Sequence, residues 1–209
     1  MNVSISGPDA RPRTQAERRA RTRAALLEAG ARGFSRYGYG NVVLEKVAGD
    51  AGYTRGALYH LFTGKEELAV AVVDWVADTW EREVWEPAQH AGTPVDILVA
   101  LARGHIVFCR RDIARVMMAL RMEFDGREHP VGTKVADIGK DLATRFGAVI
   151  ATGRRDGSIP AGPPAKTLGA AVTAAVEGLA IHLAGAPHDE AMAERMVRGL
   201  LGVSGKRAD

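Results

Sequence analysis

Apolar residues recur every three or four positions along most of this chain, a spacing typical of amphipathic helices. Between residues 44 and 51 they fall at i, i+3, i+4 and i+7, on one face of a short helix. Gly52 can take the left-handed geometry that ends a helix in a tight turn, which places Thr54 as an N-cap. A second short helix follows, with an apolar face of Leu58, Leu61 and Phe62. Helices this short must pack on a larger body, so the pattern predicts a helix–turn–helix.

The same periodicity predicts helices along the rest of the chain, with proline and glycine at their boundaries. The expected ranges are 14–37, 65–86, 93–110, 112–124, 130–156, 164–184 and a last helix that begins at Pro187. Gly38 should end the first of these ranges and Pro87 the second. No segment shows the strict alternation typical of a strand. The sequence therefore predicts an all-α protein of about nine helices.

Charge divides the chain into two unlike parts. Residues 1–65 carry eleven Arg and Lys against five Asp and Glu, whereas the whole chain has a net charge of only +3. Six of these arginines stand between Arg11 and Arg23. They could form a solvated basic tail, but beside a helix–turn–helix we favour contact with DNA phosphates. We expect a disordered basic arm at 1–13, a helix–turn–helix domain at 14–63 and a helical bundle at 64–209.

Composition narrows the class of protein. A hydrophobic share of 46% with 6% aromatic residues is typical of a soluble, mostly helical protein. The single cysteine, Cys109, excludes an intramolecular disulfide and fits a reducing compartment. No apolar run approaches the roughly 18 residues of a membrane span, and no apolar segment of a secretion signal follows the N-terminal arginines. We therefore expect a cytoplasmic protein.

Three segments of the sequence carry a family resemblance. They are LLEAGARGFSRYGY at Leu26–Tyr39, LYHLF at Leu58–Phe62 and KEEL at Lys65–Leu68. Together they resemble the DNA-binding domain of the Tet repressor (TetR) family, over roughly the first third of the chain. The resemblance implies a three-helix DNA-binding domain, followed by a helical domain for ligand binding and dimerisation.

The resemblance also implies that the second motif helix enters the major groove of DNA. Arg55 can donate two parallel hydrogen bonds to guanine, while Tyr59 and Lys65 suit phosphates. The alternative is that Tyr59 is partly core and His60 merely exposed. The expected DNA contacts are Thr54, Arg55, Gly56, Ala57, Tyr59, His60, Lys65, Arg18, Arg19 and Arg21.

One position departs from the family pattern. Val42 and Val43 stand where relatives commonly have a pair of hydroxyl residues before the first motif helix. Valine supplies neither a capping oxygen nor a hydroxyl for phosphate. We expect Asn41 to cap this helix instead, and the arginines before the motif to provide more of the grip on phosphate.

A homodimer through residues 164–201 is the next implication of the resemblance. The helices of this range are rich in small residues, which allow close approach but are also ordinary in an alanine-rich protein. Two helices from each subunit would form a four-helix bundle. The twofold pair would then read two half-sites of a palindrome.

Family relatives house a small-molecule pocket in the middle helices. The candidate lining residues are His105, Phe108, Cys109, Met117, Met118, Arg121, Met122, Phe146, Glu177 and His182, with Phe124 beside them. Each of these residue types is more often plain core than a ligand contact, and Arg121 and Glu123 could simply be solvated. The methionines would suit an adaptable apolar cavity.

Two other patterns are candidate sites. Trp75, Trp80 and Trp85 are spaced by five, so we expect them to point in different directions and to form no aromatic cage. His105 and Cys109 lie at i and i+4, a spacing that could serve a metal, a thiol sensor or a Cys–His nucleophile. No second ligand pair is near in sequence, so we favour a core pair and expect neither metal nor cofactor.

The sequence thus predicts a TetR-like transcription regulator, a repressor that a small molecule releases from a palindromic operator. An activator of the same fold and a sequence-indifferent architectural DNA binder remain as alternatives. The third alternative is a helical enzyme that uses His105 and Cys109.

Overall fold

The computed structural model describes residues 14–204, and every regular element in this range is helical. The bounds are α1 (Gln15–Asn41), α2 (Leu44–Asp50), α3 (Arg55–Tyr59), α4 (Lys65–Trp80), α5 (Glu86–Ala88), α6 (Pro94–Phe108), α7 (Arg115–Phe124), α8 (Pro130–Arg155), α9 (Ala165–Leu183) and α10 (Asp189–Leu201), with a π-helical turn η1 (Glu81–Trp85) before α5 and a 3-10 turn η2 (Asp112–Ala114) before α7. Because α4, η1 and α5 follow one another directly, the described residues form nine helices, and the all-α prediction is confirmed. The expected arm at 1–13 lies outside the described residues.

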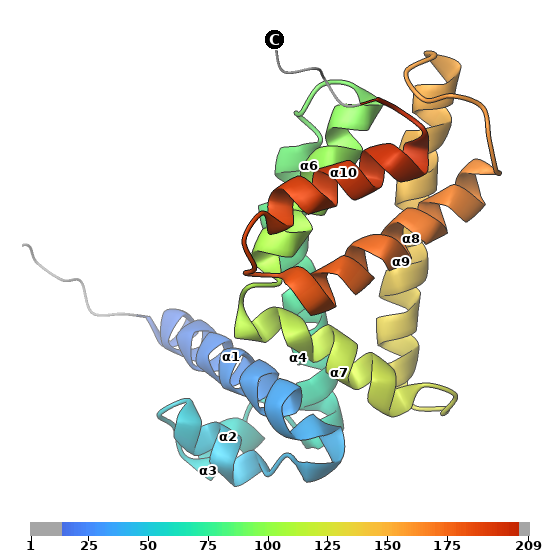
Figure 1. Ribbon diagram of the computed structural model, residues 1–209. Coiled ribbons are helices and arrows are strands. Elements are labelled where there is room, and N and C mark those ends of the chain that lie inside the picture. Colours follow the sequence, from blue (N-terminus) through green and yellow to red (C-terminus); the bar gives the residue numbers. More distant parts are fainter. Residues whose placement is uncertain (1–13, 205–209) are drawn as a thin grey trace, which may run out of the picture.

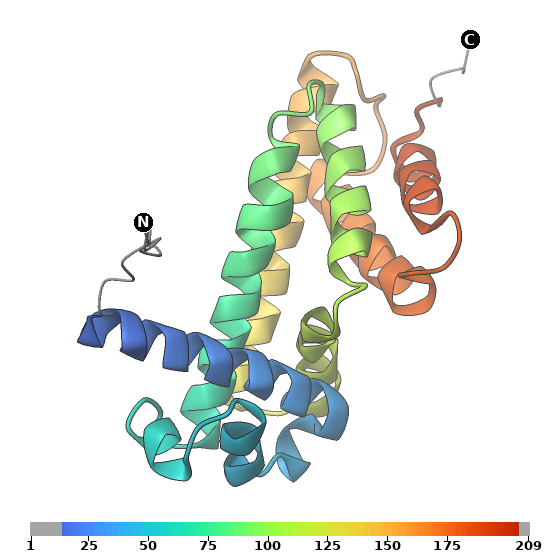
Figure 2. The same ribbon diagram turned by 90° about the vertical axis from the view of Figure 1, so that its left-hand side faces the viewer.

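The three N-terminal helices form one end of the molecule, below the bundle in Figure 1. Helix α1 lies across α4 and α7, and α2 and α3 lie on its far side. Figure 2 shows α4 running from this end along the length of the bundle, beside α8. Within residues 14–204, no helix is long and apolar enough to cross a membrane.

Helix α1 has two unlike halves. Thr14 caps it in a reciprocal capping box with Glu17, and no described residue before Leu26 is buried. From Leu26 to Phe34 the helix buries an apolar face. The prediction that Gly38 ends the helix is wrong in part, because the chain kinks at Gly38, with φ 73°, and then makes one more helical turn to Asn41.

Helices α2 and α3 are held by apolar anchors in the shared core. Val47 in α2, Leu58 in α3 and Phe62 after α3 are all buried. Gly52 joins the two helices with φ 77°, as the sequence predicts for a left-handed turn residue. The helix–turn–helix is therefore fixed from beneath, and its polar positions face outward.

The fourth helix contains a π-helical turn at Glu81–Trp85, within its predicted range of 65–86, and continues to Ala88. In such a turn the backbone bonds from i to i+5, so residues five apart stack along the helix. The rings of Trp80 and Trp85 accordingly lie 6.3 Å apart. The expectation that these two tryptophans point in different directions is wrong, because it assumed ordinary α-helical geometry. Pro87 follows the wide turn and does not end the helix, which continues to Ala88.

The bundle is closest at the crossing of α8 and α9. A β-carbon at Gly169 would lie 2.5 Å from the backbone nitrogen of Gly147 and 2.7 Å from the carbonyl oxygen of Ala143. Glycine is required here because two backbones touch. Small residues on α9 thus serve this internal contact as well as the outer surface, where Ala170, Ala171 and Ala174 are exposed.

Candidate nucleic-acid interface and internal cavity

The exposed face of α3 is the first candidate site. Thr54 caps the helix as predicted, and its hydroxyl accepts a hydrogen bond of 3.3 Å from the Ala57 amide. The buried Leu58 anchors the opposite face. Among the predicted contacts in and around α3, Ala57 is half-buried, whereas the exposed residues are Thr54, Arg55, Gly56, Tyr59 and His60.

Arg55 already has two partners within the helix–turn–helix. Its Nε lies 3.0 Å from a carboxylate oxygen of Glu45 on α2. Its guanidinium lies over the ring of Tyr59, 5.2 Å from the ring centroid. Both partners hold Arg55 at the outer surface, where its remaining N–H groups can reach another molecule.

Lys65 lies at the junction that follows α1 and is not on the face of α3. Its Nζ donates hydrogen bonds of 3.0 Å to the carbonyl oxygens of both Tyr39 and Gly40. It also lies 5.3 Å from the Tyr39 ring centroid. An ammonium group has three N–H donors, so one remains for a phosphate.

The start of α2 differs from our expectation. Val43 is its N-cap and gives no side-chain hydrogen bond. The expectation that Asn41 caps this helix is wrong, because Asn41 belongs to α1 and its side-chain nitrogen donates to the Tyr37 carbonyl at 3.1 Å. Val42 is instead buried, so its methyl groups serve the core.

The predicted arginines of α1 are all exposed but point in several directions. Arg23 lies over the ring of Phe62, 5.5 Å from its centroid, and so faces the end of α3. Arg19 stands one turn earlier on that side, at i−4 from Arg23. Arg18 and Arg21 lie on other faces of the helix. The side shared with α3 therefore carries Arg19 and Arg23.

An internal cavity lies between four helices of the bundle. Its lining residues are Trp80, His105, Leu142, Phe146, Thr173, Val176 and Glu177. His105, Phe146 and Glu177 are among the predicted ligand residues, whereas Trp80 is not. The volume of about 10 Å³ is close to the least that one water molecule requires. The cavity is thus nearly filled by the side chains that line it.

The structure does not bring the remaining predicted ligand residues to this cavity. Phe108 is buried beneath the guanidinium of Arg111, and Met117 and Met118 are half-buried on α7. Met122 is 72% exposed, and His182 is also exposed. Arg121 lies on the surface and binds Glu177 across to α9, with 2.8 Å between nitrogen and oxygen. Of these two residues, only Glu177 lines the cavity.

His105 and Cys109 form a chain of hydrogen bonds with Trp80. The indole Nε1 of Trp80 donates to Nδ1 of His105 at 3.1 Å, which assigns the histidine proton to Nε2. Nε2 lies 3.4 Å from the sulfur of Cys109. Burial lowers the pKa of His105 to about 4, and burial together with the charge of Glu177 raises the pKa of Cys109 to about 12. The pair is a neutral imidazole and a protonated thiol, which is a poor nucleophile.

We expect the lowered pKa of His105 to reduce the free energy of unfolding in mild acid. Its pKa is lower in the folded chain than the ordinary value of 6.5, so the unfolded chain binds more protons between pH 6.5 and pH 4. The stabilisation is complete above pH 6.5, and about 2 kcal/mol should be lost between pH 7 and pH 5. Urea unfolding at both pH values, compared with His105→Gln, measures this difference. An equal loss in the variant would assign the pH dependence to other groups.

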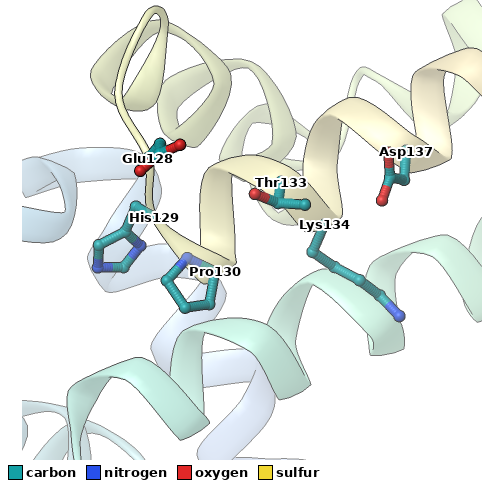
Figure 3. A pocket seen from close by; sticks show the side chains of 6 residues that line it. All are labelled: Glu128, His129, Pro130, Thr133, Lys134 and Asp137. Carbon is teal, nitrogen blue, oxygen red and sulfur yellow. The ribbon is translucent and has the colours of Figure 1, made fainter.

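A shallow groove of about 590 Å³ lies beside the start of α8. Figure 3 shows Glu128, His129 and Pro130 on the segment that leads into α8, with Lys134 reaching toward the neighbouring helix. Lys134 is bound there by Asp74 of α4 at 2.7 Å. Among residues 14–204, no group of three or more His, Cys, Asp or Glu could hold a metal ion. The groove is an open surface where α4 and α8 meet.

The sequence pattern did not identify Glu123 as a structural group. Its carboxylate accepts hydrogen bonds from the backbone amides of Tyr39, at 2.5 Å, and Gly40, at 2.7 Å. These residues are more than 80 positions apart, so no local periodicity could link them. The glycines on either side of Tyr39 are the one signal in the sequence that another side chain lies close to the backbone here.

The chain resembles known proteins in its N-terminal part. The pattern that defines the family described as "Bacterial regulatory proteins, tetR family" matches residues 26–72. Over 61 residues the chain is 39% identical to the HTH-type transcriptional regulator TtgR of Pseudomonas putida, and equally to the probable HTH-type transcriptional regulator ArpR of the same species. Each alignment covers 29% of this chain and 29% of the relative, so the chain matches less than a third of their length.

Solved structures share the fold over most of the chain. A TetR-family regulator from Agrobacterium tumefaciens has a TM-score of 0.74 at 20% identity, covering 90% of this chain and 100% of that one. SCO4454 from Streptomyces coelicolor has a TM-score of 0.73 at 19% identity, with coverages of 88% and 95%. AibR, solved in complex with isovaleryl coenzyme A and operator DNA, has a TM-score of 0.69 at 20% identity, with coverages of 88% and 100%. The match over residues 26–72 and the two relatives show that this part of the chain carries the pattern of the tetR family of bacterial regulatory proteins, and the solved structures show that the fold is shared over most of the chain.

Proposed function

We propose that the protein is a repressor that binds a palindromic operator as a homodimer and is released by a small molecule. The observation that carries the proposal is the outward face of α3, where Arg55 is held by Glu45 and Tyr59 on a firmly packed helix. A guanidinium presented in this way can read guanine in the major groove. The operator complex of AibR, a protein of the same fold, supports DNA as the partner.

The proposed dimer uses the outer surface of α9 and α10. Ile181 on α9 and Met192 and Leu200 on α10 are exposed, although side chains of this kind are usually buried. The exposed alanines of α9 would allow a second copy to approach closely. Two copies would place two α3 helices on one face of DNA, as a palindrome requires.

The proposed effector site is the internal cavity lined by Trp80, His105 and Glu177. Because this cavity has almost no free volume, a ligand must bind a more open conformation of the bundle. A ligand shifts the population only as far as it prefers that conformation. If the open conformation spaces the two α3 helices differently, ligand binding and operator binding oppose each other.

Two of the alternatives, an enzyme and an architectural DNA binder, are less well supported by the geometry. An enzyme that uses Cys109 would need a thiolate, whereas the pKa of this thiol is raised to about 12. An architectural DNA binder would not need Arg55 to be held in one position. An activator of the same fold would have the same interface, so a reporter assay in a deletion strain is needed to separate it from a repressor.

Selection of bound sequences from a random DNA pool tests the proposed function. We expect the full chain to enrich a palindrome with two half-sites about one helical turn apart. Repeating the selection with a metabolite extract should reduce the recovery of that palindrome. A protein that enriches no sequence is not an operator-binding regulator.

We expect Arg19 and Arg23 to provide phosphate contacts that are independent of DNA sequence. Replacing both by alanine should weaken binding to all sequences alike and should reduce the slope of log K against log salt by about 0.9 for each lost contact. The matched control is Arg18→Ala with Arg21→Ala, which removes the same charge from other faces of α1. Fluorescence anisotropy at several salt concentrations measures both slopes. Equal slopes for the two double variants would show that the arginines act only through net charge.

A further inference from the structure

The kinked junction between α1 and α2 is held from both sides by the bundle. The amides of Tyr39 and Gly40 donate to the carboxylate of Glu123 on α7. The carbonyl oxygens of the same two residues accept from the ammonium of Lys65 at the start of α4. The N–H and C=O groups of two successive residues are therefore all bound by charged side chains, which form stronger hydrogen bonds than neutral ones. We call this set, Tyr39, Gly40, Lys65 and Glu123, the junction clasp.

The clasp leaves no space for a larger residue at the kink. A β-carbon at Gly38 would lie 2.8 Å from a carboxylate oxygen of Glu123, and its φ of 73° favours glycine. The ring of Tyr39 packs edge-on against Phe124, at 5.1 Å between centroids, and against His129 at the same distance. Burial, with the charges of Glu66 and Glu123, raises the pKa of the Tyr39 phenol. The junction is thus tied to the end of α7 by packing as well as by hydrogen bonds.

The same helix is connected to the internal cavity two residues earlier. Arg121 donates to a carboxylate oxygen of Glu177 at 2.8 Å, and Glu177 lines the cavity. Glu177 is also close enough to Cys109 to raise the pKa of its thiol. Helix α7 therefore carries one charged group, Arg121, that is paired with a carboxylate of the cavity wall, and another, Glu123, that binds the backbone leading into the helix–turn–helix.

We propose that Glu123 is a positioning residue that sets the orientation of α2 and α3, and that the Arg121–Glu177 pair transmits the state of the cavity to it through α7. The inference rests on the proposed function, since it assumes that α3 reads DNA. A charge change at Glu177 frees Arg121, the end of α7 shifts, and the clasp loses the carboxylate that fixes Tyr39 and Gly40. The α3 helix then has no single orientation relative to the α3 helix of the second subunit.

The proposal also specifies the chemistry of an effector. Glu177 is the only ionisable carboxylate on the cavity wall within the described residues, and it is paired with Arg121. A ligand that offers a cation or a strong N–H donor can take over this carboxylate and displace Arg121. A ligand that fills the apolar part of the cavity without such a group would leave the pair intact. The effector class is therefore an apolar molecule with one basic or N–H-donating group.

A double-mutant cycle on the full chain tests the connection. Arg121→Met and Glu123→Gln should each weaken binding to the selected operator by about five- to tenfold, a typical size for coupling between sites. Because both substitutions act through the junction clasp, the double variant should bind the operator no more weakly than whichever single variant binds it more weakly. Binding to DNA of unrelated sequence should stay unchanged. Arg111→Met, which breaks the remote ion pair of Arg111 with Glu83, is the matched control and should have no effect.

Hydrogen exchange provides a second measurement that does not need DNA. In Glu123→Gln and in Arg121→Met, the amide of Gly40 should exchange faster, while amides in the middle of α9 should be unchanged. If the wild type selects no operator, the proposed function fails, and the exchange rates still decide whether Arg121 acts on the junction. Multiplicative losses in the cycle, or an unchanged Gly40 amide in Arg121→Met, would overturn the proposal.

Discussion

Gly169→Ala is expected to destabilise the fold, although alanine normally favours a helix. The added β-carbon would lie 2.5, 2.7 and 2.8 Å from three backbone atoms of α8, at Gly147 and Ala143. Backbone atoms cannot rotate away as a side chain can, so α8 and α9 must separate along their crossing. Overpacking of this kind costs about 1–3 kcal/mol. Urea unfolding at a fixed protein concentration measures the loss, because dimerisation would add to the apparent stability.

The same substitution at Gly139 provides the control. Gly139 lies within α8, and a β-carbon there would have no neighbour within 4 Å. Gly139→Ala should therefore stabilise the protein by up to about 1 kcal/mol, through the higher helix propensity of alanine. The same Gly→Ala substitution should thus lower the free energy of unfolding at position 169 and raise it at position 139. If both variants stabilise the protein, the crossing of α8 and α9 is looser than described.

Arg55→Ala is expected to have the largest effect on DNA binding. Loss of a bidentate contact with guanine removes about 1–3 kcal/mol of discrimination, and a twofold dimer loses it in both half-sites. The specific affinity should fall, and the preference at one base pair of each half-site should disappear. Repeating the sequence selection with the variant measures both effects.

Arg155→Ala removes the same charge from the opposite end of the molecule. Arg155 ends α8 and donates to the hydroxyl of Thr152, remote from α3. This variant should retain the operator preference of the wild type. An Arg55→Ala protein with unchanged base preference would show that Arg55 binds phosphate or only Glu45.

Local patterns predicted most of the fold. The left-handed turn at Gly52, the cap at Thr54 and the apolar anchor at Leu58 depend on neighbours within a few residues, so the sequence identifies them directly. The capping box of Thr93 with Asp96 likewise marks the start of α6. The match to the tetR-family pattern lies in this same local region, residues 26–72.

Distant contacts explain what the sequence did not predict. Glu123 meets its partners across 84 and 83 positions, and its neighbours in sequence give no sign of them. The π-helical turn at Glu81–Trp85 inserts one extra residue into the helix and so changes the direction in which Trp85 points. A pattern that assumes 3.6 residues in every turn cannot predict this insertion. The sequence predicts only a phosphate contact for Lys65, because the carbonyl groups that it caps belong to a junction whose path depends on Gly38.

The small volume of the cavity beside Trp80 determines in part the concentration at which an effector would act. If the open bundle is a minor population, the apparent dissociation constant equals the intrinsic one divided by the open fraction. The packing of Trp80, His105 and Phe146 would then set a response threshold, independently of the contacts that the effector makes. Relatives of this protein could adjust their sensitivity through the volume of these side chains, while retaining the chemistry by which the effector is recognised.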